Sequence, residues 1–584
     1  RPSFLEKHTR PPMLHSVLHS RCRHTLALAL AVVSAWVPRA VAAQEQQQTE
    51  PTIGYHICGS RWLHQERAAG RIAPMPMRDP RQAARASAPA QDPISVGTQL
   101  DFPVFGVIGT VSATCRFVGD RVFVFVENRD WDTDGGSIFQ SHVDGLASLF
   151  EQSTPADPQR GIYDLSVEVF GEPPDVDGYP QIFLLITDLP HTGLIGLFDA
   201  GVSDHAIPEL RRDLLYLDEF AVRRLGYLAR GTLAHELQHL IHWNWDKDEE
   251  VWIDEGLSGY AEELVGFPEA DPFAVPDFLG HSHTPLTSWP LVEVESRYYG
   301  ATYLYASFLA ERYGRPLISA LVAEVRNGTA GVDAALEKIG SADDFEDTWA
   351  SWVLANTTGG DLGNGYVALN GRRVNPFVVE SLPLSDTPGF AAQWGTSTIL
   401  FRTPGNLTVD FEGDPAGRYR VWSYSQRDGG SSLAEVELDA ANQGRSLSAA
   451  IDSVVLVVGR TSIGGGSFEL DARRFTPTSV ADLNQRADAT VPVAMQLGRG
   501  FPNPFNSSVR VPFELSSGGD VELAIIDMLG RTIWRRQFSQ LLAGKHEVDW
   551  DGTDLAGRTA ATGPYHIRLR SATQMQSTPV LLLR

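Results

Sequence analysis

The sequence has few cysteines, no excess of positive charge and no long apolar run. Three cysteines among 584 residues leave only Cys58 and Cys115 outside the amino-terminal region, so at most one disulfide can form there. The formal net charge of −24 argues against a nucleic-acid partner, because polyphosphate would be repelled. No apolar stretch approaches the roughly 20 residues of a membrane-spanning helix. We therefore expect no nucleic-acid partner and no stable membrane span.

Length and composition are those of a multidomain globular protein. A chain of 584 residues is too long for one ordinary domain and indicates about three or four. A hydrophobic content of 43% is ordinary and allows large buried cores.

The amino terminus has the pattern of an export signal. Arg21 and Arg23 precede an apolar stretch at residues 25–37, and alanines between positions 40 and 43 provide a cleavage site. We expect residues 1–43 to be a signal peptide, the alternative being a single amino-terminal membrane anchor. The protein is then secreted or held at the cell surface, and we expect it to be a monomer.

The next regions differ in character. Residues 44–96 are rich in Gln, Ala, Pro and Arg, which is typical of a linker or pro-segment. Apolar runs at 122–126, 182–186 and 214–217 predict strands, and longer helical patterns follow them. We therefore expect an α+β domain at residues 97–373, with its helices after its strands. The predicted helices cover residues 220–243, 252–265, 301–313, 316–326 and 344–354.

The remainder of the chain has the pattern of all-β domains. Residues 374–475 consist of short alternating segments separated by Gly, Asp and Pro turns, which favours a β-sandwich. We expect a linker at residues 476–491 and a second all-β domain at residues 492–584.

The chemistry is concentrated in one motif. Residues 231–243 read G-T-L-A-H-E-L-Q-H-L-I-H-W. On a helix, His235 and His239 project from one face about one turn apart, where two imidazoles can bind one tetrahedral Zn²⁺. Glu236 is turned sideways and is placed to deprotonate the catalytic water. The pattern therefore predicts a zinc-dependent hydrolase.

A second helical pattern offers a third ligand. Residues 251–264 read V-W-I-D-E-G-L-S-G-Y-A-E-E-L, with Glu255 near the start. The alternative, a solvated surface carboxylate, is less favoured because of the motif upstream. His242 follows His239 by three, and we expect it to be a polar residue at the helix end rather than a ligand.

These two segments resemble the gluzincins, the zinc peptidases whose third ligand is glutamate, and among them the hyicolysin-like group. The resemblance covers about residues 122–314, including D-V-D-G-Y-P-Q-I-F-L-L-I-T-D before the motif and Y-Y-G-A-T-Y-L-Y after it. It implies a zincin-like fold, with His235, His239 and Glu255 as zinc ligands and Glu236 as general base.

Two further roles are expected around this centre. Thermolysin-type enzymes have an acid four residues after the glutamate ligand, and this chain has Gly259 there. The carboxylate that orients a histidine must then come from elsewhere, with Glu262 and Glu263 as candidates. Tyr299 resembles the tyrosine with which some gluzincins stabilise the oxyanion, and Tyr298 is the near-equivalent choice. The alternative is that both tyrosines are core aromatics.

The role of the cysteines is open. Cys58 and Cys115 can form a disulfide or stay as two inert buried thiols. A third alternative is that Cys58, in a removable pro-segment, caps the catalytic metal as a latency switch.

Calcium is a second candidate cofactor. Asp130, Asp132 and Asp134 form a D-x-D-x-D-G run, and Asp175 and Asp177 form a shorter D-x-D-G. Such turns place oxygen ligands around a cation. They are also common without metal, and the first run lacks the glutamate that completes an EF-hand loop.

The carboxy-terminal unit resembles the flagellar hook-capping immunoglobulin-like fold, a pattern that also serves as the sorting domain of the type IX secretion system. The resemblance covers nearly all of residues 497–584, through F-P-N-P-F-N-S-S-V-R-V-P-F-E-L, I-I-D-M-L-G-R and G-P-Y-H-I-R-L-R. It implies recognition by secretion machinery, the alternative being a structural domain without a sorting role.

Together these patterns predict a secreted zinc-dependent endopeptidase acting on polypeptides, which would dock extended along an edge strand. The alternatives are an inactive adhesion or binding protein on a peptidase scaffold, and an exopeptidase.

Overall fold

The computed structural model describes most residues between His56 and Leu583. The residues outside it are 1–55, 61–62, 64–92, 105–109, 133–136, 190–192, 208–209, 269–270, 291–294, 428–429, 477–494, 499, 501, 504, 516–518, 528–530, 542–543, 556, 572–574 and 584. The expected signal peptide, most of the expected pro-segment and nearly all of the expected linker at 476–491 lie outside the described residues.

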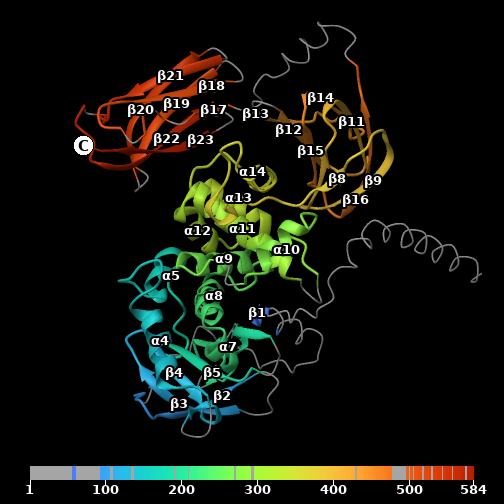
Figure 1. The fold of residues 1–584 in the computed structure, drawn as a ribbon. Coiled ribbons are helices and arrows are strands. Elements are labelled where there is room, and N and C mark those ends of the chain that lie inside the picture. The colour runs from blue at the N-terminus through green and yellow to red at the C-terminus, as the bar shows by residue number, and fades with distance from the viewer. Residues whose placement is uncertain are drawn as a thin grey trace, which may run out of the picture. The chain divides into compact units, whose positions relative to one another are not determined.

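Among the described residues, a mixed seven-stranded sheet underlies the first part of the chain, in the order β1-β6-β7-β5-β4-β3-β2 (Figure 1). Strands β4, β5 and β7 run parallel, and β6 is antiparallel to β7. The short β1 pairs in parallel with β6 at the sheet edge. The strands are β1 (His56–Cys58), β2 (Gln99–Pro103), β3 (Thr110–Val118), β4 (Val122–Glu127), β5 (Ile182–Thr187), β6 (Leu194–Phe198) and β7 (Leu214–Asp218).

The central strands are buried on both faces because successive side chains point to opposite sides. In β4, Val122, Val124 and Val126 enter the core that the helices cover. Phe123 and Phe125 enter a second core on the other face of the sheet. This explains why the central strands read as continuous apolar runs in the sequence.

Helices cover one face of the sheet, and α8 lies between the sheet and α9 (Figure 1). The helices are α4 (Gln140–Glu151), α5 (Ile162–Phe170), α6 (Ala200–Ser203), α7 (Glu219–Arg224), α8 (Gly226–Trp245), α9 (Val251–Leu264), α10 (Ala274–Gly280), α11 (Ser296–Tyr313), α12 (Arg315–Val322), α13 (Gly328–Lys338) and α14 (Phe345–Thr358).

Two expectations about this part are wrong. Helices α4 and α5 lie between β4 and β5, because parallel strands need a long crossover connection. The helices of this domain therefore do not all follow its strands, contrary to the expectation from the sequence. The single helix predicted for residues 220–243 is also divided, since Leu225 leaves helical geometry (φ −117°, ψ 43°) between α7 and α8.

The described elements from Phe377 onward are all β-strands. Two sheets, of orders β13-β12-β15-β10-β8 and β14-β11-β16-β9, enclose one core, and two further sheets, β17-β18-β21 and β20-β19-β22-β23, enclose another. The strands are β8 (Phe377–Val379), β9 (Leu384–Ala392), β10 (Thr396–Phe401), β11 (Gly405–Gly413), β12 (Tyr419–Arg427), β13 (Gly430–Glu435), β14 (Gln443–Ile451), β15 (Ser453–Arg460), β16 (Gly465–Arg474), β17 (Gln496–Leu497), β18 (Val509–Leu515), β19 (Gly519–Asp527), β20 (Thr532–Leu541), β21 (Gly544–Trp550), β22 (Gly563–Ser571) and β23 (Met575–Leu582).

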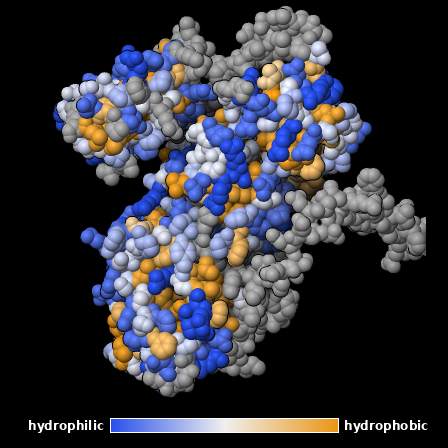
Figure 2. Space-filling model, viewed as in Figure 1, coloured by the Kyte–Doolittle hydropathy of each residue, from blue (hydrophilic) through white to orange (hydrophobic). Residues whose placement is uncertain are grey.

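Within the described ranges, none of the helices has both the length and the apolarity to cross a membrane. The face shown in Figure 2 has apolar residues interspersed among hydrophilic ones.

Candidate metal centre

Helix α8 carries the H-E-x-x-H motif deep inside the protein. The helix packs against β6 and β7, and it approaches β6 closely at Gly196. A Cβ at Gly196 would lie 2.4 Å from Cγ2 of Thr232 and 3.1 Å from Cγ of Glu236. The absence of a side chain at this position in the strand therefore lets the motif helix rest on the sheet.

A short turn brings α9 back over the motif. The amide of Asp246 donates to the carbonyl of His242 and ends α8, and Asp246 Oδ1 accepts from the amide of Asp248 at 3.2 Å. Glu255 follows in the first turns of α9. A Cβ at the next residue, Gly256, would lie 2.9 Å from the carbonyl oxygen of Thr302, so α9 is held close to α11.

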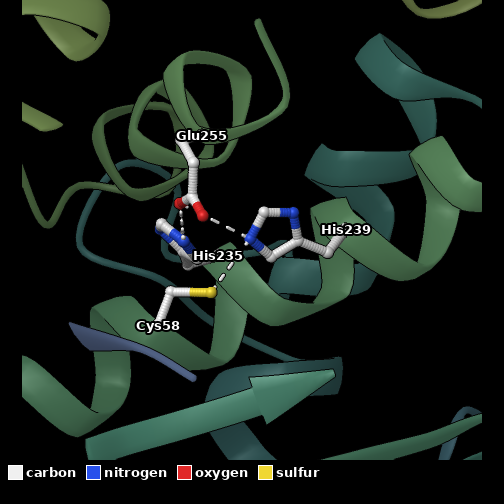
Figure 3. Close-up of side chains that lie close together, drawn as sticks. All are labelled: Cys58, His235, His239 and Glu255. Atoms are coloured by element: carbon white, nitrogen blue, oxygen red, sulfur yellow. Dashed lines mark hydrogen bonds and ion pairs between the residues drawn. The ribbon is translucent and has the colours of Figure 1, made fainter. Parts of the chain in front are cut away.

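The three expected ligands converge, and Cys58 joins them (Figure 3). Oε2 of Glu255 lies 3.3 Å from Nε2 of His235 and 3.7 Å from Nε2 of His239. Sγ of Cys58 lies 3.3 Å from Nε2 of His239. One candidate ligand atom from each of the four residues lies within 4.8 Å of the other three. Two imidazoles, a carboxylate and a thiol are a donor set that suits zinc.

Two buried polar atoms of this group lack hydrogen bonds that a bound cation would replace. His235, His239 and Glu255 are each 3% exposed, yet Nε2 of His235 and Oε2 of Glu255 have no hydrogen-bond partner in the described part of the chain. Buried polar atoms are nearly always satisfied. A divalent cation among them would satisfy both atoms, so the residues present fit zinc.

The outer nitrogens of both histidines are held by acids of α9. Nδ1 of His235 lies 2.7 Å from Oε1 of Glu262, and Nδ1 of His239 lies 2.9 Å from Oδ2 of Asp254. Such contacts would fix each ring so that Nε2 faces a metal bound in the group. Of the two candidates for this role, Glu262 is the one in place, since Glu263 accepts from the hydroxyls of Tyr303 and Ser307.

The sequence did not predict a role for Asp254 as the carboxylate that orients His239. The other oxygen of this aspartate, Oδ1, lies 2.9 Å from Nδ1 of His242, so His242 is a buried partner of Asp254 and lies outside the four-residue group. The sequence signal was the position of Asp254, directly before the expected ligand Glu255. On a helix, adjacent residues point about 100° apart, so Asp254 reaches the far side of the His239 ring.

The acids and the histidines of the centre shift each other's pKa values. Burial lowers the pKa of each motif histidine, but their acidic and thiol neighbours outweigh it, so the pKa of both His235 and His239 is raised well above its ordinary value. Burial raises the pKa of Glu236 to about 7, against the attraction of the two histidines. Because imidazole binds metal only when neutral, a metal that binds this group would release protons.

Glu236 lies next to the ligand group without belonging to it. The residue is fully buried, and its Oε1 has no hydrogen-bond partner among the described residues. Its Oε2 accepts from the hydroxyl of Ser60 at 3.3 Å and lies 4.0 Å from Sγ of Cys58. The position suits a carboxylate that exchanges protons with a molecule at the metal.

The two tyrosines lie at the start of α11. The ring centroid of Tyr299 is 5.0 Å from that of Trp289, and the ring of Tyr298 is 5.6 Å from the same tryptophan. Tyr299 precedes Thr302, whose backbone faces Gly256, by one helical turn. The oxyanion role of Tyr299 stays a prediction.

The two cysteines do not pair. Cys115 is buried in β3 and donates its thiol to the carbonyl of Phe117 at 3.3 Å; burial raises its pKa to about 11. Its burial and raised pKa match the expectation of a buried, unreactive thiol. Cys58 is buried beside His235, His239 and Glu255 instead, so of the three alternatives for this residue the geometry favours the one that places it at the expected metal site.

The structure describes only one of the two Asp-rich runs in full. Asp134 lies outside the described residues, so the first run stays a prediction. Asp175 and Asp177 are joined by Asp213, and one oxygen from each lies within 4.8 Å of the other two. Asp213 directly precedes β7 and has no sequence motif of its own, so only the fold reveals it.

Comparison with known proteins identifies one region. The model of the FlgD Ig-like domain family matches residues 503–574. No curated protein has a significantly similar sequence.

Several solved structures share a local likeness. They include PorZ, a surface component of the type-IX secretion system of Porphyromonas gingivalis (16% identity over 22% of this chain and 14% of that chain, TM-score 0.12). Latent dimeric PorU from the same organism matches at 14% identity over 31% of this chain and 18% of that chain (TM-score 0.15). FlgD from Xanthomonas campestris matches at 22% identity over 16% of this chain and 72% of that chain (TM-score 0.12). The chain thus spans less than a fifth of PorZ and PorU, and likenesses with such low TM-scores carry no argument here.

The family match confirms the expected hook-capping resemblance for residues 503–574. Strands β18 to β22 lie largely within this range and enclose their own core. Residues 503–574 therefore match an immunoglobulin-like domain of the FlgD type.

Proposed function

We propose that this protein is an exported zinc-dependent endopeptidase. The proposal depends on one observation: Nε2 of His235, Nε2 of His239 and Oε2 of Glu255 come together in a buried group beside Glu236. Oε2 of Glu255 lies 3.3 Å and 3.7 Å from the two imidazole nitrogens, yet it accepts no hydrogen bond from the described residues, as expected for an oxygen that shares a cation with both rings.

His235, His239 and Glu255 would hold the metal. Zinc, when bound there, supplies Lewis acidity toward a peptide carbonyl and lowers the pKa of water. Glu236 takes a proton from the attacking water and then gives it to the leaving amine. Tyr299 donates a hydrogen bond to the carbonyl oxygen as it becomes negative.

The substrate would be an extended polypeptide. Strand β6 lies beside β7 near the edge of the sheet, and among the described residues its outer partner is the three-residue strand β1. An extended peptide in place of β1 would gain backbone hydrogen bonds from β6 and pass the ligand group.

Export is the second half of the proposal. The amino-terminal signal pattern would direct the chain across one membrane, and the FlgD-type domain would serve as the sorting domain for type IX secretion. The protein would then be released or held outside the cell.

Metal analysis and proteolysis test the proposal together. We expect one zinc per chain, and hydrolysis of casein and of a blocked, internally quenched peptide that a chelator abolishes and zinc restores. Because Cys58 lies in the ligand group, the Cys58→Ala variant is assayed beside the unchanged chain. Cleavage of unblocked peptides alone would indicate an exopeptidase. Zinc without any cleavage by either protein would indicate a binding protein.

A further inference from the structure

The segment around Cys58 closes the candidate metal centre. Its strand β1 pairs with β6, with Cys58 opposite Gly196, and the amide of Gly59 donates to the carbonyl of Gly196 at 2.9 Å. A Cβ at Gly59 would lie 3.2 Å from that same carbonyl oxygen. A side chain at this position would crowd β6, so glycine suits the close approach of the segment that carries Cys58.

Two further contacts hold the segment in place. The hydroxyl of Ser60 donates to the carbonyl of Phe198 at 2.8 Å and lies within reach of Glu236 Oε2 at 3.3 Å. Leu63 is 1% exposed in the core on the far face of the sheet, with Leu194 and Leu197. The segment therefore contacts the metal group, the proposed base and the sheet edge at once.

We propose that Cys58 is a fourth ligand of the metal and keeps the enzyme latent. This rests on the proposed function. On binding, the thiol gives up its proton and the thiolate occupies the coordination position that water needs, while β1 occupies the edge of β6 that an extended substrate needs. Activation is the withdrawal of this segment: the metal–sulfur bond breaks, the thiolate regains a proton and water enters.

The burial of the group supports this reading. Cys58, His235, His239 and Glu255 are all 3% exposed or less, so a polypeptide has no access to the centre while the segment is in place. An open catalytic site would instead leave one metal position to solvent.

Cobalt substitution tests the ligand independently of activity. In the full chain loaded with Co²⁺, we expect the near-ultraviolet absorption of a thiolate-to-cobalt charge transfer. Cys58→Ala removes this absorption but keeps the visible d–d bands, because two imidazoles and a carboxylate still bind. Cys115→Ala is the matched control and keeps both. Absence of the charge-transfer absorption in the unchanged chain would overturn the proposal.

Activity gives the second measurement. Cleavage of the blocked peptide by the zinc-loaded Cys58→Ala variant should exceed that of the unchanged chain at least about tenfold, since most of the latter is held closed. Equal, easily measured activity in both would refute latency while leaving the endopeptidase assignment intact. Inactivity of both, with the charge-transfer absorption present, would refute the endopeptidase and leave the thiol ligand standing.

A second, independent site lies at the amino ends of the adjacent parallel strands β5 and β7. Asp175, Asp177 and Asp213 approach one another there, and Asp177 and Asp213 are each 1% exposed. Oδ2 of Asp213 accepts from the amide of Val176 at 2.9 Å. Its Oδ1 has no hydrogen-bond partner in the described part of the chain.

The backbone orients the other two carboxylates. Oδ1 of Asp175 accepts from the amide of Gly178 at 2.8 Å, and Oδ1 of Asp177 accepts from that of Tyr179 at 3.0 Å. Three carboxylates this close repel one another, and burial strengthens the repulsion. We infer that Asp175, Asp177 and Asp213 bind a calcium ion, which prefers such an all-oxygen set.

Thermal unfolding tests the calcium site. The midpoint of the zinc-loaded full chain should rise as Ca²⁺ is added at neutral pH. Asp213→Asn should lose this rise, whereas Asp120→Asn, in the exposed turn between β3 and β4, should keep it. An unchanged midpoint in the original chain, or an equal rise in Asp213→Asn, would overturn the inference.

Discussion

Oε1 of Glu262 lies 2.7 Å from Nδ1 of His235, and the other nitrogen of the same ring faces Glu255 across 3.3 Å. The imidazole is thus held between a supporting carboxylate and a ligating one, both supplied by α9. If the centre binds zinc as proposed, its affinity should depend on Glu262, which is not itself one of the proposed ligands.

Glu262→Gln should weaken zinc binding about 10- to 100-fold, because a neutral amide no longer polarises and orients the imidazole. Competition with a chromophoric chelator measures the affinity. Glu263→Gln is the matched control, since the adjacent Glu263 bonds to Tyr303 and Ser307 instead. Equal losses of affinity in the two variants would show that the effect is general destabilisation.

Glu236→Gln should retain zinc and lose about 100- to 10,000-fold in kcat, since the amide cannot accept the proton of water. Zinc content and cleavage of the blocked peptide are measured on the same preparation, both with Cys58→Ala in the background. The exposed Glu337→Gln on α13 should alter neither. Undiminished turnover would exclude Glu236 as the base.

Tyr299→Phe should lower kcat with little change in KM, because the hydroxyl is needed only when the carbonyl oxygen becomes negative. Tyr298→Phe, which alters the neighbouring ring on Trp289, provides the comparison. If Tyr298→Phe has the larger effect on kcat, the roles of the two tyrosines are exchanged.

Gly196→Ala should destabilise the fold by about 1–3 kcal/mol, because the added carbon meets Thr232 at 2.4 Å and forces α8 away from β6. Urea unfolding measures the change. Gly145→Ala in α4, where an added Cβ meets no atom within 4 Å, should stabilise slightly, since alanine favours the helix. Similar midpoints for the two variants would contradict the close approach at Gly196.

The stabilisation by calcium should shrink between neutral pH and about pH 5. Burial raises the pKa of Asp177 to about 6 and that of Asp213 well above its ordinary value, against the opposing effects of backbone hydrogen bonds and of Arg212. These carboxyls bind protons more readily folded than unfolded, so their repulsion appears only as pH rises through these values. The midpoint with and without Ca²⁺ at both pH values measures this; an equal shift at both would place the ion elsewhere.

Much of the centre follows from local spacing. His235 and His239 lie on one helical face because four residues make about one turn, and Glu255 stands near the start of the next apolar-periodic segment. The strands at 122–126, 182–186 and 214–217 correspond to β4, β5 and β7, because continuous apolar runs are what a doubly covered sheet requires.

The sequence alone determined which residues are suited to a metal and on which elements they lie, because helical and strand periodicity are local. Only the tertiary structure decided what comes together over long separations. In the folded protein Cys58 lies against His239, 181 residues away. Glu262 rather than Glu263 contacts His235. Asp213 lies close to Asp175 and Asp177. These contacts arise from strand pairing and from helix packing, which depend on the whole chain and leave no periodic signal in any one segment.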